Sequence, residues 1–451
     1  MSTKHTQVAM MEAVEDRQMF ATFMVTTTAD SGTGSLRDAI TKANNASDAD
    51  VIKFAIGSGL KTISPTSSLP MTKYALTIDG TTQPGYSGKP LIEIRGDKTS
   101  GDGIRVGGGN STIKGLVINR FSGNGMILVN KGGNTVKGNW IGLTNTGDAA
   151  AKNGAKGIVV SINNNTIGGT STNDRNVISG NGSSGVQMWS AASTGNTVLG
   201  NYVGTDWTGE KAIANLKSGI ANDGAASNTI GGTAAGARNV VSGNAHDGII
   251  VSGAGSKNIK IIGNYVGTNA LGTTAIGNKM YGIEISRDNN LVQNNLVSGN
   301  TYSGVVLWLS SAYNNKVIGN KLGTDKSGMY AIANQWKGLE VTNGAKDNII
   351  GGTLSGERNV ISGNKQNGVN VYQGSNNKFY NNYVGVGSDG IKSLGNGGDG
   401  LRLIQTAGVL ISGGIIGNNT GYGVHNGTST NTKLTGGVKL VNDALYNITI
   451  T

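Results

Sequence analysis

The chain has 451 residues, of which 75 are glycine and only 4 are proline; it has no cysteine and three widely separated histidines. This composition excludes collagen, a proline-rich linker, a disulfide framework and a cysteine- or histidine-rich metal centre. The net charge of +11 comes from scattered lysines and arginines rather than from basic runs interleaved with aromatic residues. No nucleic-acid partner is therefore predicted. No apolar run is long enough to span a bilayer.

The first part of the chain is predicted to be a leader followed by a cap. Residues 1–22 form the leader or disordered segment, and the first twenty residues lack the apolar core of a secretory signal. Residues 23–100 are predicted to form the N-terminal cap, with a strand at 23–28, a helix and several irregular strands. Ser35 suits a helix N-cap, and three apolar residues follow at helical spacing, namely Leu36, Ile40 and Ala43. This helix is expected to cover the open strand edge of the first coil.

Between residues 101 and 427, a glycine followed by alternating apolar residues recurs at intervals of 22 to 34 residues. The twelve marker glycines are Gly103, Gly125, Gly157, Gly185, Gly219, Gly248, Gly282, Gly304, Gly338, Gly368, Gly400 and Gly423. Short strands with this period-2 pattern can bury their apolar face only by stacking coil on coil. The pattern predicts an all-β, single-stranded right-handed parallel β-helix of about twelve rungs with an N-terminal capping helix. Residues 428–451, where the repeat is lost, are predicted to form a C-terminal cap.

A longer repeat of about two coils carries the segments NTIGGT, RNVISGN and GNYVGTD. Glycine and asparagine tolerate positive φ at the corners between sheets, and asparagines at equivalent corners are predicted to stack as ladders. One copy, NLVQNNLVSGN from Asn290, has lost six residues, which indicates a removable surface loop.

The GTD loops vary at their third residue, which runs Thr144, Asp206, Asn269, Asp325 and Gly387. This variation favours an Asx turn over a metal or catalytic role. A structural role is likewise predicted for Arg175, Arg238 and Arg358, which would bond loop carbonyls or the loop aspartates.

The segments VTTTADSGTGSLRDAITKAN and IDGTTQPGY, together with the repeats, resemble bacterial right-handed β-helix repeat proteins of pectin-lyase-like fold with a CSLREA-type N-terminal segment. The resemblance covers residues 23 to 425. Residues 13–23, AVEDRQMFATF, also look like the LEDR-type leader of bacterial surface proteins. The resemblance implies a secreted or cell-surface location.

The pectin-lyase-like fold is shared by lyases, hydrolases, epimerases and adhesins, so the resemblance does not specify an activity. The sequence has no Asp-Pro-His-Asp stretch like that of alginate epimerases and no Gly-His-Gly like that of polygalacturonases. It also lacks an aspartate cluster resembling a pectate lyase calcium site and the GGxGxDxUx calcium repeat. No cofactor is therefore expected, and no motif supports calcium.

The second and fourth residues after each marker glycine are predicted to face outward as two ladders on one sheet. Aromatic rings spaced along a rigid surface, with polar groups between them, suit an extended sugar chain. The predicted substrate-binding residues are Trp189, Asp223, Trp308, Asn370, Tyr372 and Arg402. The alternative is that the rings cover corners of the sheet under long loops.

Glu284 and Glu340 are the candidate catalytic residues, because they lie two rungs apart on one ladder, about 10 Å by strand spacing. That separation is near the upper end of the ~6.5 to 9.5 Å typical of inverting glycosidases. A nearby tryptophan could desolvate either carboxyl, whereas Arg287 would oppose protonation if it paired with Glu284. His425 next to Tyr422 forms a weaker lyase-like pair, for which a polar end cap is the alternative.

The leading prediction is a non-catalytic extracellular or surface β-helix protein that binds carbohydrate or acts as a rigid adhesive scaffold. Its partner would be a polysaccharide or a cell-surface glycan. The alternative is a polysaccharide-degrading enzyme, a glycoside hydrolase or lyase that acts in a groove on one sheet. A purely structural spacer is the third possibility. Any site is predicted to lie where the copies of the repeat differ.

Overall fold

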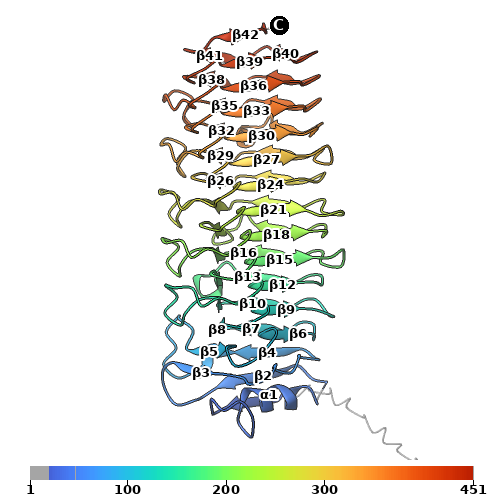
Figure 1. The fold of residues 1–451 in the computed structure, drawn as a ribbon, viewed down its shortest axis with the longest axis vertical. Helices are drawn as coiled ribbons and strands as arrows, with labels where there is room; N and C mark the ends of the chain where they lie inside the picture. The colour runs from blue at the N-terminus through green and yellow to red at the C-terminus, as the bar shows by residue number, and fades with distance from the viewer. Residues whose placement is uncertain (1–19, 46, 450–451) are drawn as a thin grey trace, which may run out of the picture.

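The computed structural model describes residues 20–45 and 47–449, so most of the predicted leader 1–22 and of its LEDR-like segment lies outside the described residues. The described chain winds into a column of stacked coils, with the N-terminal part at the bottom and the C-terminal part at the top (Figure 1). Each coil contributes strands to three parallel sheets, A, B and C, which contain 15, 14 and 13 strands. This arrangement confirms the predicted parallel β-helix.

The strands of sheet A are β1 Thr22–Val25, β2 Asp50–Phe54, β4 Leu76–Asp79, β7 Thr112–Lys114, β10 Thr135–Lys137, β13 Thr166–Gly168, β16 Thr197–Leu199, β19 Thr229–Gly231, β22 Lys260–Ile262, β25 Leu291–Gln293, β28 Lys316–Ile318, β31 Ile349–Gly351, β34 Lys378–Tyr380, β37 Leu410–Ser412 and β40 Lys433–Thr435. Those of sheet B are β3 Lys61–Ile63, β5 Ile92–Arg95, β8 Leu116–Asn119, β11 Trp140–Ile141, β14 Val177–Ile178, β17 Tyr202–Val203, β20 Val240–Val241, β23 Tyr265–Val266, β26 Leu296–Val297, β29 Lys321–Leu322, β32 Val360–Ile361, β35 Tyr383–Val384, β38 Ile415–Gly417 and β41 Lys439–Val441.

The strands of sheet C, which carry the marker-glycine pattern, are β6 Ile104–Val106, β9 Met126–Leu128, β12 Ile158–Val160, β15 Val186–Trp189, β18 Ile220–Asp223, β21 Ile249–Ser252, β24 Ile283–Ile285, β27 Val305–Trp308, β30 Leu339–Thr342, β33 Val369–Tyr372, β36 Leu401–Ile404, β39 Val424–Asn426 and β42 Leu445–Tyr446. The described residues also include helix α1 Leu36–Ala43 and three short 3-10 helices, η1 Gly80–Thr82, η2 Thr172–Asp174 and η3 Ser355–Glu357.

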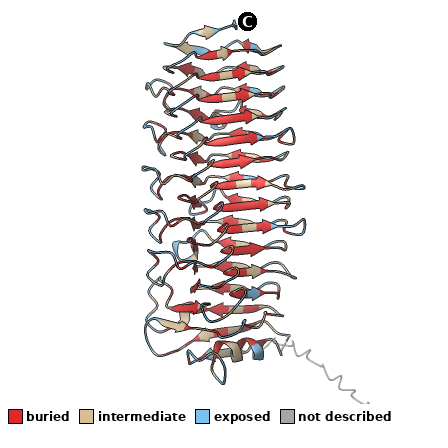
Figure 2. Cartoon of the chain, in the orientation of Figure 1, coloured by how far each residue is buried: buried red, intermediate tan, exposed pale blue. Residues whose placement is uncertain are grey.

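The core is a continuous apolar column inside the three sheets (Figure 2). In sheet C the first and third residues after each marker glycine point inward, as Ile283 and Ile285 do, and both are fully buried. Irregular strands at both ends extend the sheets beyond the twelve predicted rungs. In particular, β40, β41 and β42 continue the three sheets through residues 433–446. At about 4.8 Å per strand, the 15 strands of sheet A make a column roughly 67 Å long.

Helix α1 covers the N-terminal end of the column, as predicted. The Ser35 hydroxyl accepts a hydrogen bond from the Asp38 backbone N–H (3.1 Å) and caps the helix. Leu36, Ile40 and Ala43 are buried and belong to the same core as the first coils. The helix thereby shields the strand edge that β1 would otherwise expose.

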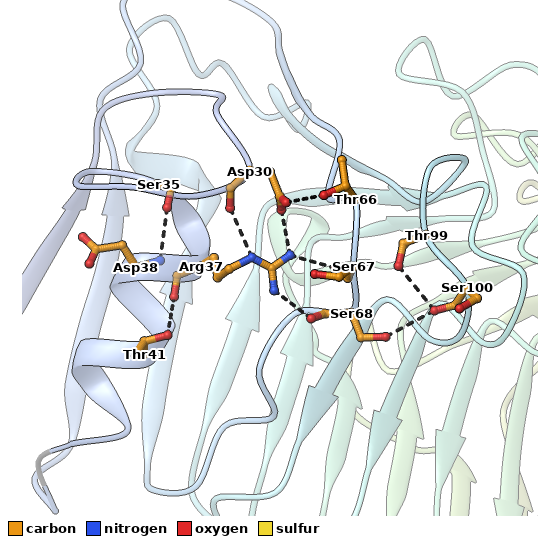
Figure 3. A network of polar contacts seen from close by, with 10 residues as sticks. All are labelled: Asp30, Ser35, Arg37, Asp38, Thr41, Thr66, Ser67, Ser68, Thr99 and Ser100. Carbon is orange, nitrogen blue, oxygen red and sulfur yellow. Dashed lines mark hydrogen bonds and ion pairs between the residues drawn. The ribbon is translucent and has the colours of Figure 1, made fainter.

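Arg37 ties this helix to a loop of the second coil (Figure 3). Its guanidinium donates to the backbone carbonyls of Ser67 and Ser68, both at 2.8 Å, and pairs with the Asp30 carboxylate at 2.7 Å. The other Asp30 carboxylate oxygen accepts a bond from Thr66 Oγ1 (2.6 Å). One side chain therefore connects the helix, the segment before it and the loop around residues 66–68.

We expect Arg37→Ala to loosen the cap, because it removes several charge-assisted hydrogen bonds at once. The expected loss is about 2 kcal/mol of local opening free energy. It is measured as faster amide hydrogen exchange in α1 and β1. Lys42→Ala, which breaks only the exposed i,i+4 pair with Asp38, should change exchange by less than about 0.5 kcal/mol. Equal effects of the two substitutions would contradict the role of Arg37.

Buried asparagines form the predicted ladders along the corners of the column. Each side-chain amide donates to the side-chain oxygen of the asparagine one coil further on, at distances such as 2.8 to 3.1 Å. The ladder between sheets A and B contains Asn139, Asn176, Asn201, Asn239, Asn264, Asn295, Asn320, Asn359 and Asn382. The ladder between sheets B and C contains Asn153, Asn181, Asn215, Asn244, Asn278, Asn300, Asn334, Asn364, Asn396 and Asn419.

The marker glycines are needed for a reason other than the positive φ that is predicted for corner residues. At Gly282, a Cβ atom would collide with the Val297 side chain and lie 2.6 Å from the Gly304 carbonyl oxygen of the next coil. No positive φ is involved there. Corner residues such as Asn164 (φ 56°) do adopt the left-handed conformation. The marker glycines are required because neighbouring coils approach too closely for a side chain.

The repeated loops are structural, as predicted. Asp206 and Asp325 close Asx-type turns, since the Asp206 carboxylate accepts backbone bonds from Glu210 and Lys211 at 3.0 and 3.1 Å. The arginines do not pair with these aspartates, but Arg358 Nε donates to the Asn381 carbonyl (3.0 Å), as the other predicted use requires. All three guanidiniums also stack on tyrosine rings of sheet B at 3.9 to 4.0 Å, in the pairs Arg175–Tyr202, Arg238–Tyr265 and Arg358–Tyr383.

Candidate functional site

Three positions of each coil, between the ladder asparagine and the marker glycine that follows it, differ between coils. In four consecutive coils these tripeptides read AHD, KMY, TYS and QWK. They place polar and aromatic side chains beside the N-terminal ends of β21, β24, β27 and β30, which are neighbours in sheet C. The side chains are His246, Asp247, Tyr281, Tyr302, Ser303, Trp336 and Lys337.

Glu284 lies in the middle of this group on the outward ladder of sheet C. The register places it between Ile250 and Val306, with Glu340 next after Val306. Although it faces outward, the residue is only 6% exposed, and no hydrogen bond or ion pair reaches its carboxyl from the described residues. Burial, with a smaller contribution from the charge of Asp247, raises the pKa of Glu284 to about 7.

Glu340 has the same exposure, 6%, but a different environment. Its carboxylate accepts a 2.6 Å hydrogen bond from Ser303 Oγ and a 2.6 Å ion-paired bond from Lys337 Nζ. A carboxylate has about four acceptor positions, so two remain for a water or a substrate. The Glu284 carboxyl is thus unpaired, whereas the Glu340 carboxylate is ion-paired. Such a difference is typical of a general acid and its general-base partner.

Tyr281 and Asp247 complete the polar part of the group. Burial and the negative charges of Glu340, Glu284 and Asp247 raise the pKa of Tyr281 to about 12, which keeps its hydroxyl a hydrogen-bond donor. Burial also raises the pKa of Asp247, whose carboxylate contacts His246 Nδ1 at 2.8 Å and accepts the Tyr281 backbone N–H at 3.1 Å.

Aromatic rings line one side of the carboxyl pair. The Tyr281 and Tyr302 ring centroids are 5.7 Å apart, and those of Tyr302 and Trp336 are 4.6 Å apart. Trp336 keeps an exposed face, and Lys337 Nζ lies 4.9 Å from its centroid. Such a row offers flat apolar surfaces beside charged groups, which matches the two kinds of surface that a sugar presents.

The predicted binding residues fall into two sets. Trp308 on β27 is 37% exposed, and the strand register places Thr342 and then Tyr372 next to it on the same outward ladder. The ladder that carries Glu284 and Glu340 continues with Asn370, Arg402 and His425. Trp189 and Asp223 pair with each other in β15 and β18 and lie three and two rungs before Glu284, about 14 and 10 Å away. They are apart from the carboxyl pair.

A pairing between Arg287 and Glu284 would oppose protonation of this carboxyl. Arg287 does not pair with it: the guanidinium donates to the carbonyls of Gly253 (2.8 Å) and Ser286 (3.1 Å) and to Ser311 Oγ (2.9 Å). Arg287 therefore does not oppose the raised pKa of this carboxyl.

A second polar group lies further along the same ladder. His425 Nδ1 contacts an Asp399 carboxylate oxygen at 3.1 Å, and its ring touches those of Tyr422 and Tyr446 at centroid distances of 5.4 and 4.7 Å. Arg402, the register neighbour of His425, has a buried Nε without a partner among the described residues.

Within residues 20–45 and 47–449, no three His, Cys, Asp or Glu side chains gather in a way that could hold a metal ion. No helix in the same range is long and apolar enough to cross a membrane. Hollows of about 390 and 380 Å³ lie along sheet B rather than over Glu284.

Comparisons with known proteins give likeness at the level of the chain trace. No protein-family model matches the chain, and no curated protein is significantly similar to it. Similar solved structures include the periplasmic alginate epimerase AlgG, with 16% identity, a TM-score of 0.41 and coverage of 85% of this chain and 79% of that one. The mannuronan C-5 epimerase AlgE6 A-module of Azotobacter vinelandii has 14% identity, a TM-score of 0.42 and coverage of 95% and 98%. The Dettilon tailspike protein has 17% identity, a TM-score of 0.38 and coverage of 90% and 64%.

The leading prediction of a non-catalytic binding protein or adhesive scaffold is contradicted. Glu284 is a buried carboxyl without a hydrogen-bond or ion-pair partner among the described residues, and an inert scaffold does not need such a group. Burial of such a group costs stability, so it is typical of a functional site. The alternative prediction, an enzyme with a groove on one sheet, agrees better with this carboxyl.

Proposed function

We propose that this protein is a polysaccharide-degrading enzyme whose active site lies on sheet C around Glu284 and Glu340. The observation that carries the proposal is the contrast between these carboxyls two ladder positions apart. One is buried, unpaired and has a pKa of about 7; the other is held by an ammonium and a hydroxyl. A neutral acid beside a charged carboxylate is the arrangement that glycoside hydrolysis requires.

In this proposal Glu284 donates its proton to the glycosidic oxygen as the bond to the departing sugar breaks. Glu340 orients a water and accepts its proton while that water attacks the anomeric carbon. The spacing of two rungs, about 10 Å, leaves room for the water between carboxylate and sugar and favours inversion over a covalent intermediate. Lys337 and Ser303 fix the Glu340 carboxylate, and the Tyr281 hydroxyl, which stays protonated under the charges of both glutamates, supplies a further donor.

A lyase reaction at the second polar group is the other candidate. His425, oriented by Asp399, would remove the proton next to the carboxylate of a uronic acid unit, and Arg402 would hold that carboxylate. The C–O bond to the departing sugar would break as the double bond forms, and the Tyr422 hydroxyl beside His425 would give its proton to the leaving oxygen. The unpaired Nε of Arg402 is the observation that favours this candidate.

The test is a product survey with purified protein on neutral and acidic polysaccharides. New reducing ends without ultraviolet absorbance would support hydrolysis, and an unsaturated product absorbing near-ultraviolet light would support the lyase. Activity must fall by more than about tenfold in Glu284→Gln for the first case and in His425→Ala for the second. If neither product forms from any polysaccharide, the proposal of a degrading enzyme fails.

The aromatic ladder should contribute unequally to substrate binding. We expect Trp308→Ala to raise KM about tenfold with little change in kcat, because it removes a stacking surface beside the carboxyl pair. Trp189→Ala is the matched control, since that ring is 55% exposed but lies three rungs before Glu284. Steady-state kinetics on the substrate found in the survey measures both. A KM change that is equal in the two variants would place the binding groove elsewhere.

Location and chain organisation follow from the resemblance and remain proposals. We propose that the protein acts outside the cytoplasm or on a cell surface, as β-helix repeat proteins with CSLREA-type segments do. The proposed units are the leader 1–22, the cap 23–100, the repeats 101–427 and the C-terminal cap 428–451. The proposed partner is a polysaccharide.

A further inference from the structure

A second surface of the column, the outer face of sheet B, carries its own pattern. The first residue of each short strand faces outward there, and the register joins these residues into one ladder. Tyrosine recurs on this ladder, as Tyr202, Tyr265 and Tyr383, each under the guanidinium of a loop arginine. Where the next tyrosine should stand between Tyr265 and Tyr383, the ladder has Lys321.

The same region has lost the loop that would cover it. The segment from Asn290 lacks the six residues that form the GGT loop in the neighbouring copies. A hollow of about 390 Å³ occupies this place, and its lining includes Arg238, Tyr265, Asn294, Lys321 and Lys326. We call it the basic recess. The deletion that interrupts the repeat is therefore also the origin of a cavity.

The basic recess concentrates positive charge without a matching carboxylate. Among the described residues, neither Lys321, Lys326 nor Arg238 forms an ion pair, and no Asp or Glu lines the hollow. Asp325, next in sequence to Lys326, is engaged by Ser327 Oγ and by the backbone of its own turn. Three cations that share one recess repel one another, so an anion bound there would lower the free energy.

Comparison of the copies shows that both lysines are departures from the scaffold. At the position of Lys321 the other long coils have an aromatic residue, which is Trp140 in the first of them and tyrosine in the rest. At the position of Lys326 the other copies have Asn145, Trp207, Ala270 and Ser388. The scaffold therefore does not need a cation at either position. Both changes occur in the one coil pair where the loop is missing.

We propose that the basic recess binds the carboxylate or sulfate group of an acidic polysaccharide, at a site separate from the carboxyl pair on sheet C. Arg238 and the two lysines supply charge-assisted hydrogen bonds to the anion, and Asn294 lines the same hollow. The Tyr265 face is already covered by Arg238, so the recess offers no free ring on which a nucleic-acid base could stack. This proposal is independent of the reaction on sheet C.

The test measures binding by isothermal titration calorimetry at low salt. The probes are polygalacturonate for carboxylates, dextran sulfate for sulfates, unmodified dextran as the neutral polymer, and single-stranded oligo(dT). The variant is Lys321→Tyr combined with Lys326→Ala, which installs residues that the scaffold holds in other coils. We expect the wild-type protein to bind at least one acidic polysaccharide, and the double variant to bind it about tenfold or more weakly.

The matched control is Lys316→Ala, which removes an exposed lysine of the same coil from sheet A and should leave the affinity unchanged. Polygalacturonate and dextran sulfate distinguish carboxylate from sulfate recognition. The proposal is overturned if no acidic polysaccharide binds, if the double variant binds as tightly as the wild type, or if oligo(dT) is the polymer whose binding the double variant loses.

Discussion

Glu284→Gln is expected to reduce turnover of the polysaccharide substrate by about 10²- to 10⁴-fold, the usual loss when a general acid is removed. The glutamine amide keeps the shape of the side chain but has no proton of suitable acidity to give to the leaving oxygen. KM should change little, since the carboxyl contributes to the transition state rather than to ground-state binding. Steady-state kinetics of both proteins, on the polysaccharide that the wild-type enzyme degrades, measures the effect. A variant with more than a tenth of wild-type turnover would contradict the assigned role.

Although Glu284→Gln should reduce activity, it should increase the stability of the fold, by an amount that depends on pH. Burial raises the pKa of Glu284 from 4.5 in the reference state to about 7. Between these values the folded protein holds a proton that the unfolded chain has released, so its stability falls as pH rises. The penalty is absent below about pH 4.5 and complete above about pH 7. It amounts to at most roughly 3 kcal/mol for a shift of this size.

Glu284→Gln therefore should be more stable than the wild type at pH 8.5 and equally stable at pH 4. Denaturant unfolding of the two proteins at both pH values measures this difference. Glu340→Gln serves as the contrasting variant, because it removes an ion pair and a hydrogen bond and should destabilise the fold at pH 8.5. If Glu284→Gln were instead destabilising at pH 8.5, its carboxyl would have stabilising partners that the geometry does not contain.

Asn244→Ala is expected to cost about 4 kcal/mol of unfolding free energy, more than any of the other substitutions. The Asn244 amide donates to Asn278 Oδ1 (2.9 Å) and to the Val203 carbonyl (3.2 Å), and its oxygen accepts from Asn215 (2.9 Å). Alanine would leave these fully buried partners unsatisfied, and each such group costs about 1 to 3 kcal/mol.

The matched control is Asn173→Ala, at an exposed asparagine of the η2 loop, which should change stability by less than about 0.5 kcal/mol. Chemical denaturation gives the difference in midpoint, and hydrogen exchange in β17, β20 and β23 shows whether the coils around the gap open first. Neighbouring coils depend on one another in a stacked repeat, so the opening should be localised there. A cost below about 1 kcal/mol would mean that water replaces the lost amide.

The architecture could be predicted from the sequence because each of its causes is local and repeated. Alternating apolar residues, marker glycines and corner asparagines recur often enough to define strand, face and corner, and even the cap at Ser35 follows from a short pattern. The marker glycine at Gly282 shows the limit of this reasoning. Its necessity comes from the approach of the next coil, which a sequence read along one strand does not reveal.

The site was harder to predict because it depends on contacts between coils. Ladder counting correctly placed Glu284 and Glu340 two rungs apart, but not their burial or the partners that distinguish them. Tyr281, Trp336 and Lys337 lie in the variable tripeptides and were overlooked, although their variation was itself the signal. A position that takes many different residues across the copies of a repeat is less constrained by the scaffold and is available for function.

The asparagine ladders also give the column a direction. In the ladder between sheets B and C, each side-chain amide donates one N–H to the asparagine of the next coil, so this row of bonds keeps one sense along the column. The last amide, that of Asn419, donates to a carboxylate oxygen of Asp443 at 2.8 Å. A negative charge thus terminates the aligned row, much as an acidic residue neutralises the start of a helix. The solenoid can in principle be lengthened by whole coils, provided that the final amide still finds such an anionic stop.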